Sequence, residues 1–137
     1  MVPTTERPRI FQIGFNKCGT RTLHAFFVQN GISAVHWDKG RLAARMFANL
    51  HFGRRCMEGY EETAFSDMVL VNNNGVMLFG YKLFRELDAQ YPKSFFILNT
   101  RDFDKWMTSW LSHVSTNPNR GLLRTRMAQA LGISEQS

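Results

Sequence analysis

The sequence predicts an α/β fold, in which a mainly parallel central sheet is flanked by helices. Short apolar runs rich in β-branched and aromatic residues alternate with longer segments whose apolar residues recur every three or four positions. This alternation is typical of parallel strands connected through helices. With 137 residues, 44% of them hydrophobic, the chain is long enough for one domain and its core. A single domain over residues 1–137 is therefore expected.

The first strand is expected at residues 9–15, RIFQIGF, a short apolar run of the kind found in buried parallel strands. A glycine-containing segment, NKCGT, follows it. Residues 20–30 then carry apolar side chains at helical spacing, and Gly31 is placed as a C-cap, which predicts a helix. Strand, glycine loop and helix thus follow one another directly.

The middle of the chain is expected to add two strands and two helices. The strands are expected at residues 33–37 and 65–71, and the helices at residues 39–52 and 81–91. Asp38 stands where it would cap the first of these helices, and residues 53–63 are expected to form an exposed loop. The second helix should turn Leu83, Phe84 and Leu87 toward the core.

The last predicted strand, residues 94–100 (SFFILNT), has the strongest β-forming composition of the four. The helix expected after it, over residues 103–114, carries an apolar stripe at helical spacing and has Asp102 as its N-cap. Trp106 and Trp110 belong to that stripe and are expected in the core.

Composition and charge narrow the class of protein. Seventeen Lys and Arg against eleven Asp and Glu give a net charge of +6, which favours an anionic partner. No apolar run reaches the ~20 residues of a membrane helix, and the N-terminus has no apolar signal segment. Two cysteines, Cys18 and Cys56, fit neither a disulfide framework nor a zinc site. A cytoplasmic protein without a metal is expected.

Two loops that follow predicted strands carry the chemistry of an anion site. In the first, Gly14 and Gly19 allow backbone amides to face an anion, and the next helix adds its positive N-terminal dipole. Lys17 can place a charge on a phosphate or sulfonyl oxygen. The candidate ligands are Asn16, Lys17, Cys18, Gly19, Thr20, Arg21 and Thr22. The loop is not GxxxxGK[ST], because its lysine precedes the second glycine.

The segment IGFNKCGTRTL resembles the phosphosulfate-binding loop of sulfotransferases, a strand followed by PKSGT or PKCGT and a helix. Asn16 stands where that family usually has proline, and Arg21 replaces a common second threonine. The resemblance extends to Arg101 after a strand and Ser109 eight residues later, the spacing of the family's pair for the donor 3′-phosphate. It covers most of residues 9–114 and is closest to small bacterial members.

This resemblance implies a P-loop-like three-layer fold and the transfer of a sulfonyl group from 3′-phosphoadenylyl sulfate (PAPS) to a hydroxyl or amine. Adenosine 3′,5′-bisphosphate (PAP) would be the product. Lys17 would stabilise the leaving phosphate, the amides of residues 18–22 would hold the 5′-phosphosulfate, and Arg101 with Ser109 would anchor the 3′-phosphate. The acceptor is expected to be a small molecule or a glycan, without a metal or a nucleic acid.

A general base should take the proton of the acceptor. The candidates are His36, at the end of the second predicted strand, and Asp67, in the third. His36 is alternatively a core histidine, and Asp67 alternatively a cap or the partner of an arginine. Cys18 lies near a helix N-terminus, which lowers a thiol pKa, but no partner of a cysteine enzyme is visible, which favours a loop role.

Two other functions stay open at this point. A nucleotide kinase or NTPase is disfavoured by the missing GK[ST] motif. A non-catalytic module that binds anions or nucleic acid would carry aromatic residues interleaved with basic ones on a strand face, whereas most aromatic residues here follow a core period.

Sulfotransferases normally continue with a C-terminal helical region and a further donor-binding segment. Here only one more helix is expected, over residues 121–131, so the chain is expected to lack a C-terminal portion. A homodimer that shares elements would make up the missing length.

Overall fold

A computed structural model describes residues 7–72, 74–112 and 131–132 of the chain. Its central sheet has the order β2-β3-β1-β6, and every neighbouring pair is parallel. These strands are β1 (Ile10–Gln12), β2 (Ala34–His36), β3 (Ala64–Ser66) and β6 (Phe95–Ile97). The flanking helices are α1 (Thr20–Gln29), α2 (Arg41–His51) and α3 (Phe84–Gln90). The predicted α/β fold with a mainly parallel sheet is confirmed.

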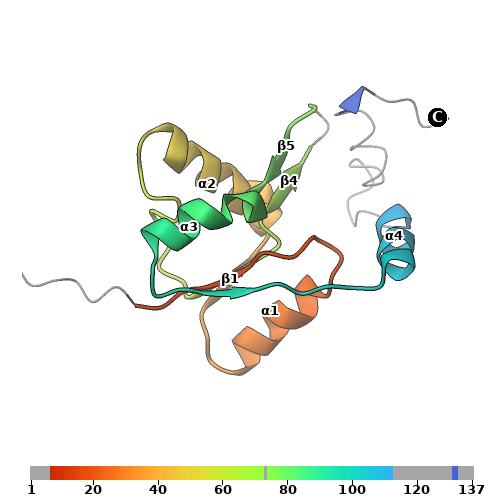
Figure 1. The fold of residues 1–137 in the computed structure, drawn as a ribbon, viewed down its shortest axis with the longest axis horizontal. Coiled ribbons are helices and arrows are strands. Elements are labelled where there is room, and N and C mark those ends of the chain that lie inside the picture. The colour runs from red at the N-terminus through yellow and green to blue at the C-terminus, as the bar shows by residue number, and fades with distance from the viewer. Residues whose placement is uncertain (1–6, 73, 113–130, 133–137) are drawn as a thin grey trace, which may run out of the picture.

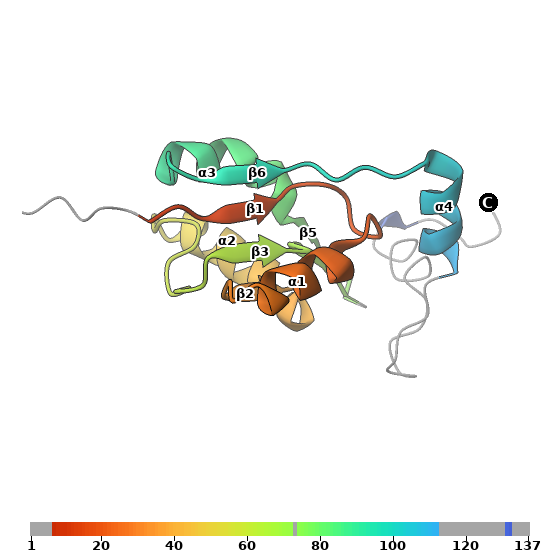
Figure 2. The same ribbon diagram turned by 90° about the horizontal axis from the view of Figure 1, so that it is seen from below.

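The layers are seen most clearly edge-on. Helix α1 packs on one face of the sheet, over β2 and β3, while α2 and α3 cover the other (Figures 1 and 2). The last helix, α4 (Phe103–Leu111), lies beyond the end of the sheet at which the four parallel strands finish (Figure 2). That edge is where parallel α/β sheets bind their ligands.

The main core lies between the sheet and the α2–α3 layer. The fully buried ring of Phe11 on β1 stacks on that of Phe65 on β3, with centroids 5.6 Å apart. Tyr91 and Phe96 approach Phe11 from the β6 side, at 5.9 and 5.7 Å. Because burying one such ring contributes roughly 2–3 kcal/mol, this cluster holds β1 in the centre of the sheet.

The prediction of one strand over residues 65–71 is wrong. Strand β3 ends at Ser66, and Asp67 has a left-handed φ of 52°, which no continuous strand contains. The chain turns there into β4 (Val69–Val71), which pairs antiparallel with β5 (Met77–Phe79). This hairpin leaves the plane of the sheet (Figure 1).

The prediction that Asp38 caps the second helix is also wrong. A short 3₁₀ turn, η1 (Asp38–Gly40), precedes α2, and the N-cap of α2 is Gly40. The carboxylate of Asp38 instead accepts a hydrogen bond from the Arg41 guanidinium at 2.7 Å. Three consecutive left-handed residues, Trp37, Asp38 and Lys39, cause the difference, since they move Asp38 away from the helix start.

Residues 53–63 form no regular element, as expected, but they are not simply exposed. The side chains of Cys56 and Met57 are fully buried in the main core. The amide of Asn49 on α2 donates to the carbonyl oxygens of Cys56 and Glu58, both at 3.0 Å. These bonds fold the segment against α2, which a local sequence pattern does not reveal.

The last two helices agree with their predictions in part. The helix expected at residues 81–91 is a 3₁₀ turn, η2 (Gly80–Leu83), followed by α3. Leu87 is buried as predicted, whereas Phe84 is 43% exposed. Asp102 caps α4 as predicted, since its Oδ2 atom accepts from the Lys105 amide at 3.1 Å.

Trp106 and Trp110 are only half-buried, because α4 stands off the end of the sheet instead of lying on its face. Except for its last position, the helix expected at residues 121–131 falls outside the described residues.

Candidate anion site at the carboxyl end of the sheet

Two loops meet at the edge where the parallel strands end. The β1–α1 loop (residues 13–19) follows β1, and the β6–α4 loop (residues 98–102) follows β6, the strand beside it. Arg101 Nη1 donates to the carbonyl oxygen of Lys17 at 3.0 Å. The two segments that the sequence marks as anion-binding are therefore in direct contact.

Three successive carbonyl groups of the β1–α1 loop accept hydrogen bonds from the β6–α4 side. Trp106 Nε1 donates to Asn16 at 2.9 Å, Arg101 to Lys17, and Asn99 Nδ2 to Cys18. In a trans peptide the carbonyl and the next N–H point in opposite directions. The amides that follow these carbonyls therefore point away from these three donors.

The backbone of the β1–α1 loop curls in the manner of anion-binding loops. Lys17 and Gly19 have left-handed φ values of 67° and 78°, and Gly19 is the N-cap of α1. Alternation of left- and right-handed residues turns successive N–H groups toward one point. Gly14 brings the loop against β6, because a Cβ there would overlap the side-chain and carbonyl oxygens of Asn99.

Several charges converge at this point. Burial lowers the pKa of Lys17, and the nearby Arg21 and Arg101 guanidinium groups lower it further, while the Asp67 carboxylate opposes them. Burial raises the pKa of Asp67 to about 6, although Lys17 and Arg21 work in the opposite direction. Two guanidinium groups thus act on one half-buried lysine beside a single carboxylate, an arrangement that favours a bound anion.

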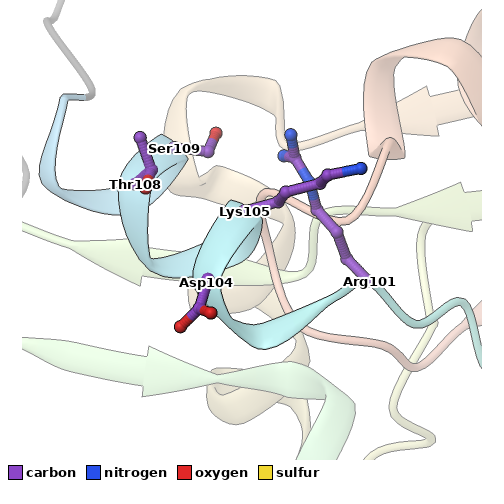
Figure 3. A pocket seen from close by; sticks show the side chains of 5 residues that line it. All are labelled: Arg101, Asp104, Lys105, Thr108 and Ser109. Atoms are coloured by element: carbon purple, nitrogen blue, oxygen red, sulfur yellow. The ribbon is translucent and has the colours of Figure 1, made fainter.

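The second part of the site is an open pocket of about 320 Å³ along α4. Arg101, Lys105 and Ser109 line it, together with Asp104 and Thr108. Figure 3 shows the two cationic side chains and the Ser109 hydroxyl on one side of the helix, with Asp104 directed away. Arg101 and Ser109, which the resemblance to sulfotransferases pairs, line the same pocket.

The two candidate bases also lie together. His36 Nε2 is 3.7 Å from Asp67 Oδ2, and His36 Nδ1 is 3.0 Å from the Ser66 hydroxyl. Burial, with His24 and Arg21 nearby, lowers the pKa of His36 to about 4. At neutral pH His36 is therefore neutral and Asp67 mostly ionised, so the pair is not an ion pair. Asp67 is a stronger base than an ordinary aspartate.

The Cys18 thiol lies in the β1–α1 loop and is half-buried. Burial raises its pKa, although Arg101 opposes the shift, so the thiol is protonated at neutral pH. The loop position inferred from the sequence is consistent with this chemistry. Cys56, in the core, has its pKa raised to about 12 by burial.

Sequence reasoning missed four polar residues of this region. Lys105 and Thr108 line the pocket of α4, and the signal for them was their position off its apolar stripe. Gln12 and Asn99 join the strand ends through hydrogen bonds. Their signal was a polar residue inside or at the end of an otherwise apolar strand.

Within the part of the chain that the structure describes, no group of three or more His, Cys, Asp or Glu side chains is arranged to hold a metal ion. Over the same residues, no helix has the length and apolar character needed to cross a bilayer.

Comparison with known proteins identifies the family. The model of the sulfotransferase domain family matches residues 9–133, which is most of the chain. The protein therefore belongs to the sulfotransferase domain family, and its class of chemistry is sulfonyl transfer. No curated protein and no solved structure matches the chain.

Proposed function

We propose that the protein transfers the sulfonyl group of PAPS to the hydroxyl or amine of a small molecule or glycan. The observation that carries the proposal is the contact of Arg101 with the Lys17 carbonyl, which joins two cationic loops at one edge of the sheet. PAPS has anionic groups on both sides of its ribose, a 5′-phosphosulfate and a 3′-phosphate. A ligand of that form needs two anion sites side by side.

Each loop would take one end of the donor. The amides of residues 18–22, at the start of α1, would hold the 5′-phosphosulfate, helped by the helix dipole. Side chains of Asn16, Thr20, Arg21 and Thr22 would add contacts from the same loop. Arg101 and Ser109 would bind the 3′-phosphate in the pocket along α4. Lys105, which lines that pocket as well, would add a second cation.

The transfer step requires a base beside the attacking acceptor atom and a cation beside the leaving phosphate oxygen. The acceptor oxygen or nitrogen attacks sulfur while the bond from sulfur to the bridging phosphate oxygen breaks. That oxygen keeps the electron pair and leaves as part of PAP. Lys17 would neutralise the charge that builds on the leaving phosphate.

Asp67 would take the acceptor proton, because its pKa of about 6 leaves it ionised at neutral pH yet more basic than usual. His36, neutral and 3.7 Å away, would share in holding that proton.

Calorimetric titration with PAP, without magnesium, tests the donor site. Saturable binding is expected for the wild type. In Lys17→Ala and Arg101→Ala, binding should weaken by roughly 10–100-fold, because each loses a charge-assisted bond of about 1.5–3 kcal/mol. Lys93→Ala and Arg85→Ala, exposed cations on the α3 side of the molecule, serve as matched controls and should bind as the wild type does.

Failure of the folded wild type to bind PAP would overturn the proposal. A requirement for magnesium would point instead to a nucleotide kinase. Equal loss in the Arg85→Ala control would show that binding depends on net charge alone, and would also count against a defined site.

A further inference from the structure

We infer that Gln12 and Asn99 are positioning residues, which hold the two anion loops at the separation that one bisphosphate ligand requires. The inference rests on the proposed donor site. It follows from a chain of hydrogen bonds that runs through these two amides, from the end of β3 across β1 to β6 and back to the β1–α1 loop.

The first half of the chain is centred on Gln12, the last residue of β1. Its Oε1 atom accepts from the Asp67 amide at 3.2 Å. Its Nε2 group donates to the Gly14 carbonyl at 2.8 Å and to Asn99 Oδ1 at 2.5 Å. One side chain thus binds the ends of three neighbouring strands, β3, β1 and β6.

Asn99 continues the chain from β6. Its Oδ1 atom accepts from Gln12, and its Nδ2 group donates to the Cys18 carbonyl. Asn99 is two residues before Arg101, and Cys18 directly follows Lys17. The amide of Asn99 therefore fixes the 3′-phosphate segment against the phosphosulfate segment.

The direction of this chain suits an amide in both positions, because an amide carries a donor and an acceptor side by side. Its outer partners are a backbone N–H, which can only donate, and two backbone carbonyls, which can only accept. Gln12 must therefore accept on one side and donate on the other, and so must Asn99. A carboxylate cannot donate, and an apolar side chain can do neither.

Burial explains why the sheet keeps a polar residue here. Gln12 is 1% exposed, in a strand whose neighbours are apolar, and a buried amide stabilises a structure only when its bonds are made. Among the described residues, its side chain bonds to the strand ends that carry the site. We therefore expect Gln12 to set the distance between the two loops, and not to fill space in the core.

The test compares two ligands that differ by one phosphate. PAP engages both loops, whereas adenosine 5′-monophosphate engages the β1–α1 loop alone. Calorimetry of the full chain gives the ratio of their dissociation constants for the wild type, Gln12→Met and Asn99→Ala. The wild type should prefer PAP by roughly 10–100-fold, the contribution expected of charged hydrogen bonds to a phosphate.

In both variants this preference should fall by about tenfold, because loops that are no longer held at the right distance cannot both bind the same PAP molecule. The affinity for the monophosphate should change by less than about threefold, since the β1–α1 loop retains its own amides. Asn99→Ala breaks the same chain at a half-exposed residue, and it serves if Gln12→Met does not fold.

Asn49→Ala is the matched control. Asn49 is a buried amide on α2 that also bridges two backbone carbonyls, those of Cys56 and Glu58, and both acceptors lie outside the two anion loops. It should lower stability without changing the preference for PAP.

Three results would count against the inference. An unchanged preference in Gln12→Met and Asn99→Ala would overturn it and leave the proposed function standing. The inference would also be overturned if the affinities for PAP and for adenosine 5′-monophosphate fell by the same factor, because a merely structural role predicts that result. No PAP binding by the folded wild type would overturn the proposed function, and the positioning role with it.

Discussion

Arg101 donates a hydrogen bond to the carbonyl oxygen of Lys17 at 3.0 Å, although 84 residues separate the two in the chain. The guanidinium of Arg101 therefore has two tasks, since it lines the α4 pocket and also fixes the β1–α1 loop. Guanidinium suits this because its planar fork carries several donors in fixed directions, whereas an ammonium group is a point charge.

We expect Arg101→Lys to be costly although it conserves charge. The lysine cannot reach the Lys17 carbonyl and a phosphate together, so PAP should bind about tenfold more weakly. The salt dependence of binding should stay close to that of the wild type, because the number of charges is unchanged. Calorimetry at two salt concentrations measures both quantities. Wild-type affinity in Arg101→Lys would contradict the double role, and Arg85→Lys is the control.

The rate of sulfonyl transfer should depend on the ionisation of Asp67. Because the pKa of Asp67 is raised to about 6, the rate should fall as pH drops through 6 and level off above it. Asp67→Asn, which tolerates the left-handed φ at this position, should lose roughly 10²–10⁴-fold in rate.

PAP released from PAPS, with an acceptor found by screening, is the measurement. Asp88→Asn, an exposed carboxylate on α3, is the control and should keep the wild-type rate. A flat pH profile in the wild type between pH 5 and 8 would exclude Asp67 as the base.

The pH dependence of stability should separate Asp67 from His36. Burial raises the pKa of Asp67 from 3.8 to about 6, so the folded state binds its proton more tightly and this group lowers stability as pH rises through that window. Burial lowers the pKa of His36 from 6.5 to about 4, so the unfolded state binds that proton more tightly and stability rises with pH there. The two effects oppose each other in the wild type.

Single substitutions should reveal each effect. Asp67→Asn keeps His36, so its free energy of unfolding should rise by up to roughly 3 kcal/mol as pH increases from 4 to 6.5. His36→Gln keeps Asp67, so its free energy of unfolding should fall by up to roughly 3 kcal/mol as pH increases from 4 to 6. Urea denaturation at a series of pH values measures this. Slopes of the same sign in the two variants would contradict the assigned shifts.

Gly14→Ala tests how closely the β1–α1 loop must approach β6. The added Cβ would overlap Asn99, so we expect a loss of about 1–3 kcal/mol in the free energy of unfolding, as for other overpacked sites, and a loss of PAP binding. Gly31→Ala is the matched control. Its Cβ meets nothing within 4 Å, but its φ is 73°, so it should cost about 1–2 kcal/mol through backbone strain and leave binding intact.

Chemical denaturation and calorimetry on the same two variants give both values. If Gly14→Ala bound PAP as the wild type does, the close approach of the loop to Asn99 would not matter for the site.

Local patterns in the sequence are enough to predict the α/β fold and the glycine-containing β1–α1 loop, because helix and strand periods and glycine positions are read within a few residues. The cap at Asp102 was predictable for the same reason, since its partner is the Lys105 amide three residues away. The pairing of Arg101 with Ser109 comes instead from the resemblance to sulfotransferases.

The contacts across the strand ends follow from tertiary packing. The break at Asp67 depends on a left-handed residue that a run of β-forming residues conceals, and the burial of Cys56 depends on Asn49 in another element. The contact between Gln12 and Asn99 joins residues 87 positions apart. Such contacts follow from which strands become neighbours, and no local period encodes that order. The candidate residues of the two loops could therefore be named from the sequence, but the distance between the loops depends on the pairing of β1 with β6.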